Sequence, residues 1–121
     1  MQTITNQTYE SMVRSLAKQG TVILEELTGS RCNLWHMATG ISGEAGELLD
    51  AVKKHVAYNK TLDVENIVEE LGDLEFYMEG LRQELGITRQ ETLDGNYDKL
   101  MKKRYPQGYS DAAAHARADK A

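Results

Sequence analysis

Two stretches of the sequence carry the same acidic pattern, Glu-x-Gly followed by Glu or Asp and then Leu, at residues 44–48 and 70–74. Residues three apart on a helix differ by about 60° around its axis, so each stretch presents its two acidic side chains as neighbours. The four side chains are those of Glu44, Glu47, Glu70 and Asp73. Either pair alone would pass as ordinary solvated surface. The repetition, with a glycine inside each copy, favours a functional site.

Four carboxylates brought together without a compensating Arg would repel one another, raise some of their pKa values and cost stability. A divalent cation removes that conflict. Mg²⁺ takes oxygen ligands at about 2.1 Å, keeps several waters and commonly bridges protein carboxylates to substrate phosphates. We therefore expect the four carboxylates to hold Mg²⁺, with Mn²⁺ as a substitute, and a small polyanion to bind through the metal.

Glycines at positions 40, 43 and 46 surround the first acidic pair. Inside a helix each would cost up to about 1 kcal/mol relative to alanine. Close approach of a neighbouring helix, or of a substrate, along the face of Gly40 and Gly43 would explain why glycine stands there. The face that carries the carboxylates is thus expected to be notched.

The elements that position these carboxylates are predicted to be helices, because the long stretches before Pro106, the single proline, follow a helical period. We predict an all-α, four-helix bundle-like fold. The secondary structure of residues 21–30 is ambiguous from the sequence. Its helices are expected at residues 6–18, 33–58, 62–85 and 88–104, with a further short helix after Ser110. The whole chain, 1–121, is predicted as one domain, with a core at about 31–110 and a C-terminal tail at 111–121.

Local signals define the ends of these helices. Asp63 is a candidate N-cap, Gly86 a stop signal, and Thr88 with Glu91 has the spacing of a capping box. On the helix at 62–85, the second acidic pair lies at the edge of an apolar stripe, so these carboxylates are expected to be partly buried.

Composition narrows the class of protein. The 121 residues carry a formal net charge of −5 and a single cysteine, Cys32. The charge argues against a partner such as duplex nucleic acid, and no apolar run is long enough to span a membrane. The lone cysteine excludes an internal disulfide, and the polar first residues do not resemble a signal peptide. We expect a cytoplasmic protein.

The sequence resembles the MazG-like all-α nucleoside triphosphate (NTP) pyrophosphatases, whose signature is E-x-x-E on one helix and E-x-x-D on the next. Beyond the four carboxylates, the resemblance covers roughly residues 33–110, and its motifs lie at residues 40–47, 69–73, 96–106 and 108–110. Many relatives carry a further Glu where this chain has Gly43, and the amino-terminal third matches weakly. The compact length and the Tyr-Pro-x-Gly-Tyr-Ser ending are similar to phage-encoded members.

This resemblance implies Mg²⁺-dependent hydrolysis of an NTP to its monophosphate and pyrophosphate, with Glu47 or Glu70 as the base that activates water. It also implies a role in adjusting a deoxynucleotide pool, in the host cytoplasm for a phage-encoded protein. Related enzymes form dimers or dimers of dimers, and short helices with polar faces leave apolar surface to cover, so a homotetramer or homodimer is expected. Phosphoribosyl-ATP pyrophosphohydrolase, or a catalytically silent interaction module, remains an alternative.

Six further polar or aromatic residues are candidates to bind substrate. His36 shares a helix face with Glu47, and Tyr77 follows Glu70 by two turns, so either could contact a phosphate or base or else simply pack. The basic and amide candidates for phosphate oxygens are Lys54, Asn96, Lys99 and Arg104. Without the resemblance these four would be read as solvated surface; with it, a phosphate role is favoured.

Overall fold

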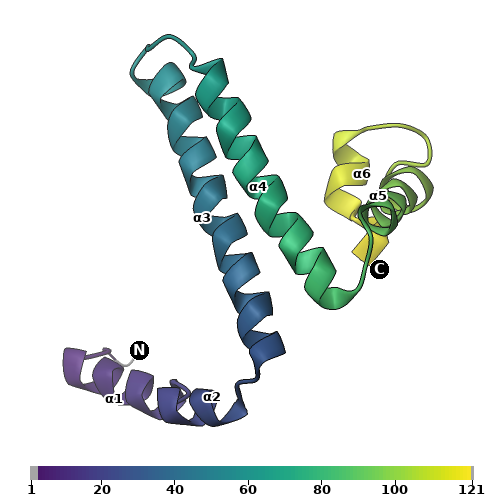
Figure 1. The fold of residues 1–121 in the computed structure, drawn as a ribbon. Coiled ribbons are helices and arrows are strands. Elements are labelled where there is room, and N and C mark those ends of the chain that lie inside the picture. The colour runs from purple at the N-terminus through teal and green to yellow at the C-terminus, as the bar shows by residue number, and fades with distance from the viewer. Residues whose placement is uncertain (1–2, 121) are drawn as a thin grey trace. The chain divides into compact units, whose positions relative to one another are not determined.

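The computed structural model describes residues 3–120, and these residues form helices and no β-strand (Figure 1). The elements are α1 (Asn6–Leu16), α2 (Gly20–Glu26), α3 (Gly29–Ala57), α4 (Val64–Leu85), α5 (Arg89–Tyr97), the π-helix η1 (Asp98–Arg104), α6 (Asp111–Ala116) and the short 3-10 helix η2 (Ala118–Lys120). The prediction of an all-α fold is confirmed. The chain divides into two compact units, with the boundary between Cys32 and Asn33.

The first unit contains α1 and α2. The hydroxyl of Thr5 accepts a hydrogen bond from the backbone N–H of Thr8 and so caps α1, which begins at the predicted residue and ends at Leu16. The ambiguous stretch at 21–30 is helical up to Glu26 as part of α2 and again from Gly29 as the start of α3. Two contacts fix Glu26, the last residue of α2. Lys18 Nζ pairs with Glu26 Oε2 at 2.6 Å, and Arg31 Nη1 donates to the Glu26 carbonyl oxygen at 2.6 Å.

In the second unit, α3 and α4 run side by side in opposite directions and form a hairpin (Figure 1). Three contacts lie along it: Asn33 Nδ2 with Glu84 Oε2 at 3.2 Å, the Met37 side chain against Gly80, and the Tyr77 ring against Gly40. Each step of four or three residues forward on α3 is matched by the same step backward on α4. The two helices therefore keep one register over this length.

The turn between α3 and α4 is fixed by local hydrogen bonds. His55 Nδ1 donates to the carbonyl oxygen of Lys60 at 2.7 Å, and the Lys60 N–H donates to the carbonyl oxygen of Lys54 at 3.2 Å. Asn59 takes a left-handed conformation, with φ 53°, that asparagine tolerates better than most residues. As predicted, Asp63 caps α4, because its Oδ1 accepts from the Asn66 N–H at 3.0 Å.

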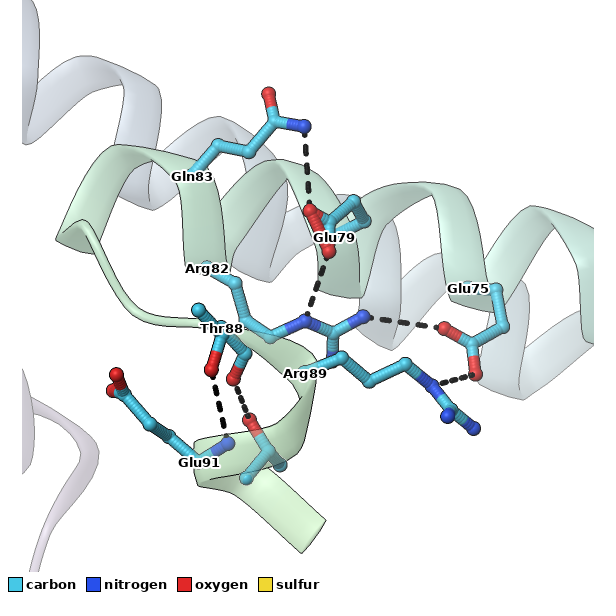
Figure 2. A network of polar contacts seen from close by, with 8 residues as sticks. Glu75, Glu79, Arg82, Gln83, Thr88, Arg89 and Glu91 are labelled. Atoms are coloured by element: carbon cyan, nitrogen blue, oxygen red, sulfur yellow. Dashed lines mark hydrogen bonds and ion pairs between the residues drawn. The ribbon is translucent and has the colours of Figure 1, made fainter.

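The end of α4 is tied by a network of charged side chains, drawn in Figure 2. Arg82 Nε donates to Glu79 Oε1 at 3.2 Å and its Nη2 to Glu75 Oε2 at 3.3 Å, while Arg89 Nε lies 4.0 Å from Glu75 Oε1 (Figure 2). Arg82 is only 7% exposed. Since Arg89 is the first residue of α5, Glu75 links the two helices.

The predicted stop at Gly86 is confirmed by its left-handed φ of 68°, and Thr88 Oγ1 caps α5 by accepting from the Glu91 N–H at 3.1 Å. The predicted helix at 88–104 ends at Arg104 as expected, but it is α-helical only up to Tyr97 and π-helical from Asp98 to Arg104. Ser110 caps α6, the short helix expected in the tail.

No hydrophobic side chain is buried within the part of the chain that the structure describes. On the predicted apolar stripe of α4, Ile67, Leu74, Met78 and Leu81 are partly buried, while Leu71 is 50% exposed and Leu85 54%. A single chain therefore leaves uncovered the apolar faces that its helical pattern provides.

Candidate metal centre and its groove

Three of the four predicted carboxylates meet across the hairpin. Glu44 and Glu47 of α3 and Glu70 of α4 each offer one oxygen, and these oxygens all lie within 4.8 Å of one another. The hairpin register explains the meeting. Glu47 lies seven residues beyond Gly40 on α3, and Glu70 lies seven residues before its partner Tyr77 on α4. The contacts that lock the helices thus also bring the acidic pairs face to face.

Two of these oxygens are shielded from solvent and have no hydrogen-bond partner, namely Oε2 of Glu44 and Oε2 of Glu70. Burial raises the pKa of Glu70 to about 7, and the neighbouring carboxylates of Glu44 and Glu47 add to the rise. No ion pair neutralises the three carboxylates within residues 3–120. Unpaired oxygen donors of this kind fit a hard divalent cation such as Mg²⁺.

Asp73, the fourth predicted ligand, is exposed and lies outside this cluster of oxygens. It lies one turn beyond Glu70 on α4. In the hairpin register it stands across from Glu44, because both are four residues from the Gly40 and Tyr77 contact. Its role as a ligand stays a prediction.

The glycines of α3 divide into two kinds. A Cβ added at Gly40 would overlap the ring of Tyr77, so the predicted close approach of a neighbouring helix is confirmed there. At Gly43 and Gly46 no atom lies within 4 Å of an added Cβ. These two glycines instead line a hollow of about 580 Å³, here called the carboxylate hollow, together with Glu47, Asp50, Ala51, Lys54, Asn66 and Glu70.

The other predicted binding residues fall in two places on the hairpin. Lys54 lines the carboxylate hollow and pairs with Asp50 at 3.0 Å. His36 and Tyr77 lie on the opposite side of the carboxylates along the helices, with ring centroids 6.2 Å apart in an edge-on arrangement. The sequence had not singled out Asp50 or Asn66. Their spacing could have identified them, because Asp50 lies one turn after Glu47 and Asn66 one turn before Glu70.

The remaining three candidates lie on α5 and η1. Asn96 is exposed and Lys99 is half-buried. Arg104 forms two hydrogen bonds to Asp119, at 2.6 and 2.9 Å, and the Asp119 side chain is only 2% exposed. These hydrogen bonds to Arg104 hold the pKa of Asp119 below its ordinary value, although burial opposes them, and the charge of Lys99 adds to the lowering. A carboxylate of the chain itself thus engages Arg104.

A family model of the MazG nucleotide pyrophosphohydrolase domain matches residues 34–109, which include the whole carboxylate cluster. The chain belongs to the MazG family. The curated proteins and the solved structures compared with the chain gave no match. Membership of the MazG family implies a nucleotide substrate, and the family is typically metal-dependent, in keeping with the acidic trio. Within residues 3–120 no helix is long and apolar enough to cross a membrane.

Proposed function

We propose that this MazG chain is an Mg²⁺-dependent pyrophosphohydrolase that converts a ribo- or deoxyribonucleoside triphosphate to its monophosphate and pyrophosphate. The observation that carries the proposal is the trio of carboxylates with two shielded, unpartnered oxygens, of which Glu47 and Glu70 line the carboxylate hollow. At about 580 Å³ the hollow has the size of ordinary small-molecule sites.

In this proposal Glu44, Glu47 and Glu70 hold the metal, and Asp73 joins them from the next turn of α4. Bound Mg²⁺ would neutralise charge on the triphosphate and favour attack at phosphorus. Glu47 or Glu70 accepts a proton from the attacking water, whose oxygen forms a bond to the α phosphorus. The bond from that phosphorus to the bridging oxygen of the β phosphate breaks, and pyrophosphate leaves with the electron pair.

The side chains around the carboxylates suggest how the rest of the substrate is held. Lys54 offers a positive charge at one end of the hollow. His36 and Tyr77 offer aromatic edges for the nucleoside on the other side of the carboxylates. We propose that Asn96 and Lys99 also bind phosphate oxygens, and that Arg104 does so once Asp119 is displaced.

We further propose that the chain self-associates as a homotetramer or homodimer. Four large apolar side chains on the hairpin, those of Trp35, Leu49, Val56 and Phe76, are 67–74% exposed. A second copy with closed symmetry would cover such a surface. We also propose a cytoplasmic role in adjusting a deoxynucleotide pool, because the Tyr-Pro-x-Gly-Tyr-Ser segment at residues 105–110 is similar to that of phage-encoded members.

The test is release of pyrophosphate from each common NTP and deoxy-NTP, measured with and without Mg²⁺. We expect release that requires the metal and is lost in Glu47→Gln. Cleavage of phosphoribosyl-ATP, with no turnover of the common nucleotides, would replace the proposed substrate with that compound. Absence of turnover on all of them, with Mg²⁺ or Mn²⁺, would favour a silent interaction module.

A further inference from the structure

A second hollow lies beside the carboxylate hollow, at the turn between α3 and α4. This turn hollow, of about 220 Å³, is lined by Ala51, Lys54, Lys60, Thr61, Asp63 and Asn66. Three residues, Ala51, Lys54 and Asn66, line both hollows. The two hollows therefore adjoin, and we treat them together as one groove from the carboxylates past Lys54 and Asn66 to Lys60.

The charge of this groove changes sign along its length. The carboxylate end contains Glu47 and Glu70, whereas the turn end contains the ammonium groups of Lys54 and Lys60. Asp63 also lines the turn end, but its carboxylate already caps α4. Asp50 pairs with Lys54, and both side chains are more than half exposed, so that pair is weak and easily exchanged for a phosphate.

Lys60 and Asn66 are available to a ligand. Within residues 3–120, Lys60 takes part in no ion pair, and the side-chain amide of Asn66 makes no hydrogen bond. The backbone of Lys60 is nonetheless held on both sides, by His55 at its carbonyl and by Lys54 at its N–H. The backbone of Lys60 is thus fixed, while its ammonium group is free to bind a ligand.

We infer that the turn end of the groove is a subsite for the terminal phosphate of the substrate, formed by Lys60 and Asn66 together with Lys54. The inference rests on the proposed triphosphate substrate. The helical rise of about 1.5 Å per residue puts Lys54 roughly 10 Å beyond Glu47 along α3. A phosphate chain whose α phosphate lies at the carboxylates extends toward the lysines, and the terminal phosphate of a triphosphate comes nearest to Lys60.

The groove is therefore directional and selects by phosphate-chain length. The nucleoside points toward His36 and Tyr77, on the side of the carboxylates away from the turn. The leaving pyrophosphate lies between Lys54 and Lys60. A nucleoside diphosphate fills the carboxylate end and leaves Lys60 without a ligand, so it binds more weakly than the triphosphate.

The experiment compares Lys60→Gln with Lys53→Gln. Lys53 lies at the same end of the hairpin, but it sits over the ring of Tyr58, 5.7 Å from its centroid, and lines neither hollow. Both variants lose one positive charge near the turn, so their difference isolates the groove. We expect Lys60→Gln to raise KM for the NTP about three- to tenfold, with kcat changed less than twofold, and Lys53→Gln to change neither.

Chain length is tested with the nucleoside diphosphate as a competitive inhibitor, whose Ki should be the same in Lys60→Gln as in the wild type. Equal KM values in the two variants, or an equal weakening of diphosphate and triphosphate, would overturn the subsite. Calorimetry with inorganic pyrophosphate gives a readout independent of turnover, and Lys60→Gln alone should weaken its binding about three- to tenfold. If no nucleotide is hydrolysed, the proposed function fails, and calorimetry still decides whether Lys60 binds phosphate.

Discussion

Replacing Gly40 by Ala should reveal the packing that sets the register of the hairpin. An added Cβ would overlap Cγ, Cδ1 and Cε1 of the Tyr77 ring, which are rigid atoms close to the backbone of α4. At Gly46, on the same helix, an added Cβ meets nothing within 4 Å. The same substitution is therefore expected to change stability in opposite directions at two positions of α3.

The magnitudes follow from these two environments. At Gly46, Ala should raise the free energy of unfolding by about 0.5–1 kcal/mol, which is the helix-propensity difference. At Gly40 that gain is opposed by overpacking, which costs about 1–3 kcal/mol, so we expect a net loss of about 1 kcal/mol. The two variants should thus differ by about 2 kcal/mol, or roughly 8 °C in Tm for a chain of this length.

Urea denaturation followed by circular dichroism, at one fixed protein concentration, measures both effects. The concentration is fixed because the unfolding of a self-associating chain depends on it. Adding Tyr77→Ala to Gly40→Ala should cost less than Tyr77→Ala costs in the wild type, because the overlap is then gone. If Gly40→Ala were as stable as Gly46→Ala, the hairpin register described here would be refuted.

Four further outcomes are expected. Glu47→Gln and Asp73→Asn should each lower turnover about a hundredfold or more with unchanged helical content; near wild-type Mg²⁺-dependent rates in both would remove them from the site. In metal-free protein, Glu70 keeps its proton in the folded state up to about pH 7 but loses it near 4.5 when unfolded. Its contribution to stability is present at low pH and lost as the pH rises through this window, so Tm should fall from pH 5 to 7.5, less so in Glu70→Gln. Saturating Mg²⁺ at pH 7.5 should raise Tm, and an unchanged value would contradict a carboxylate metal site. Arg82→Met should lower the free energy of unfolding by about 2 kcal/mol, since two charged hydrogen bonds are lost but the acidic partners stay half-exposed; a change below about 0.5 kcal/mol would show that the network in Figure 2 is not formed in solution.

The features that sequence patterns predicted are those with local causes. Asp63, Gly86 and Thr88 act through backbone groups only a few residues away, and the structure confirms all three. The pairing of Glu44 with Glu47 likewise follows from helix geometry alone. The cross-helix meeting with Glu70 could be expected but not located, because it depends on which residues of α3 and α4 pack together.

The features that escaped prediction are those that no sequence pattern signals. The burial of Arg82 runs against the usual place of arginine at the surface, and it needs Glu75 and Glu79 on the same side of α4. The π-helical turns from Asp98 follow hydrogen bonding that composition does not signal, such as the bond from the Tyr105 N–H to the Leu100 carbonyl oxygen. The continuation of the groove to Lys60 appears only once the turn is folded.

In the hairpin, the position of the carboxylates and the position of Lys60 depend on different parts of the chain, so evolution and design can change them independently. The register of the hairpin is set within the helices, by the notches at Gly40 and Gly80, and not by the length of the turn at residues 58–63. Doubling the length of such a turn costs only about 0.6 kcal/mol of loop entropy. A longer or recomposed turn would keep the carboxylates in place while moving Lys60. Hydrolytic chemistry and selection of the phosphate chain would then behave as separate modules, one in the helices and one in an exchangeable loop.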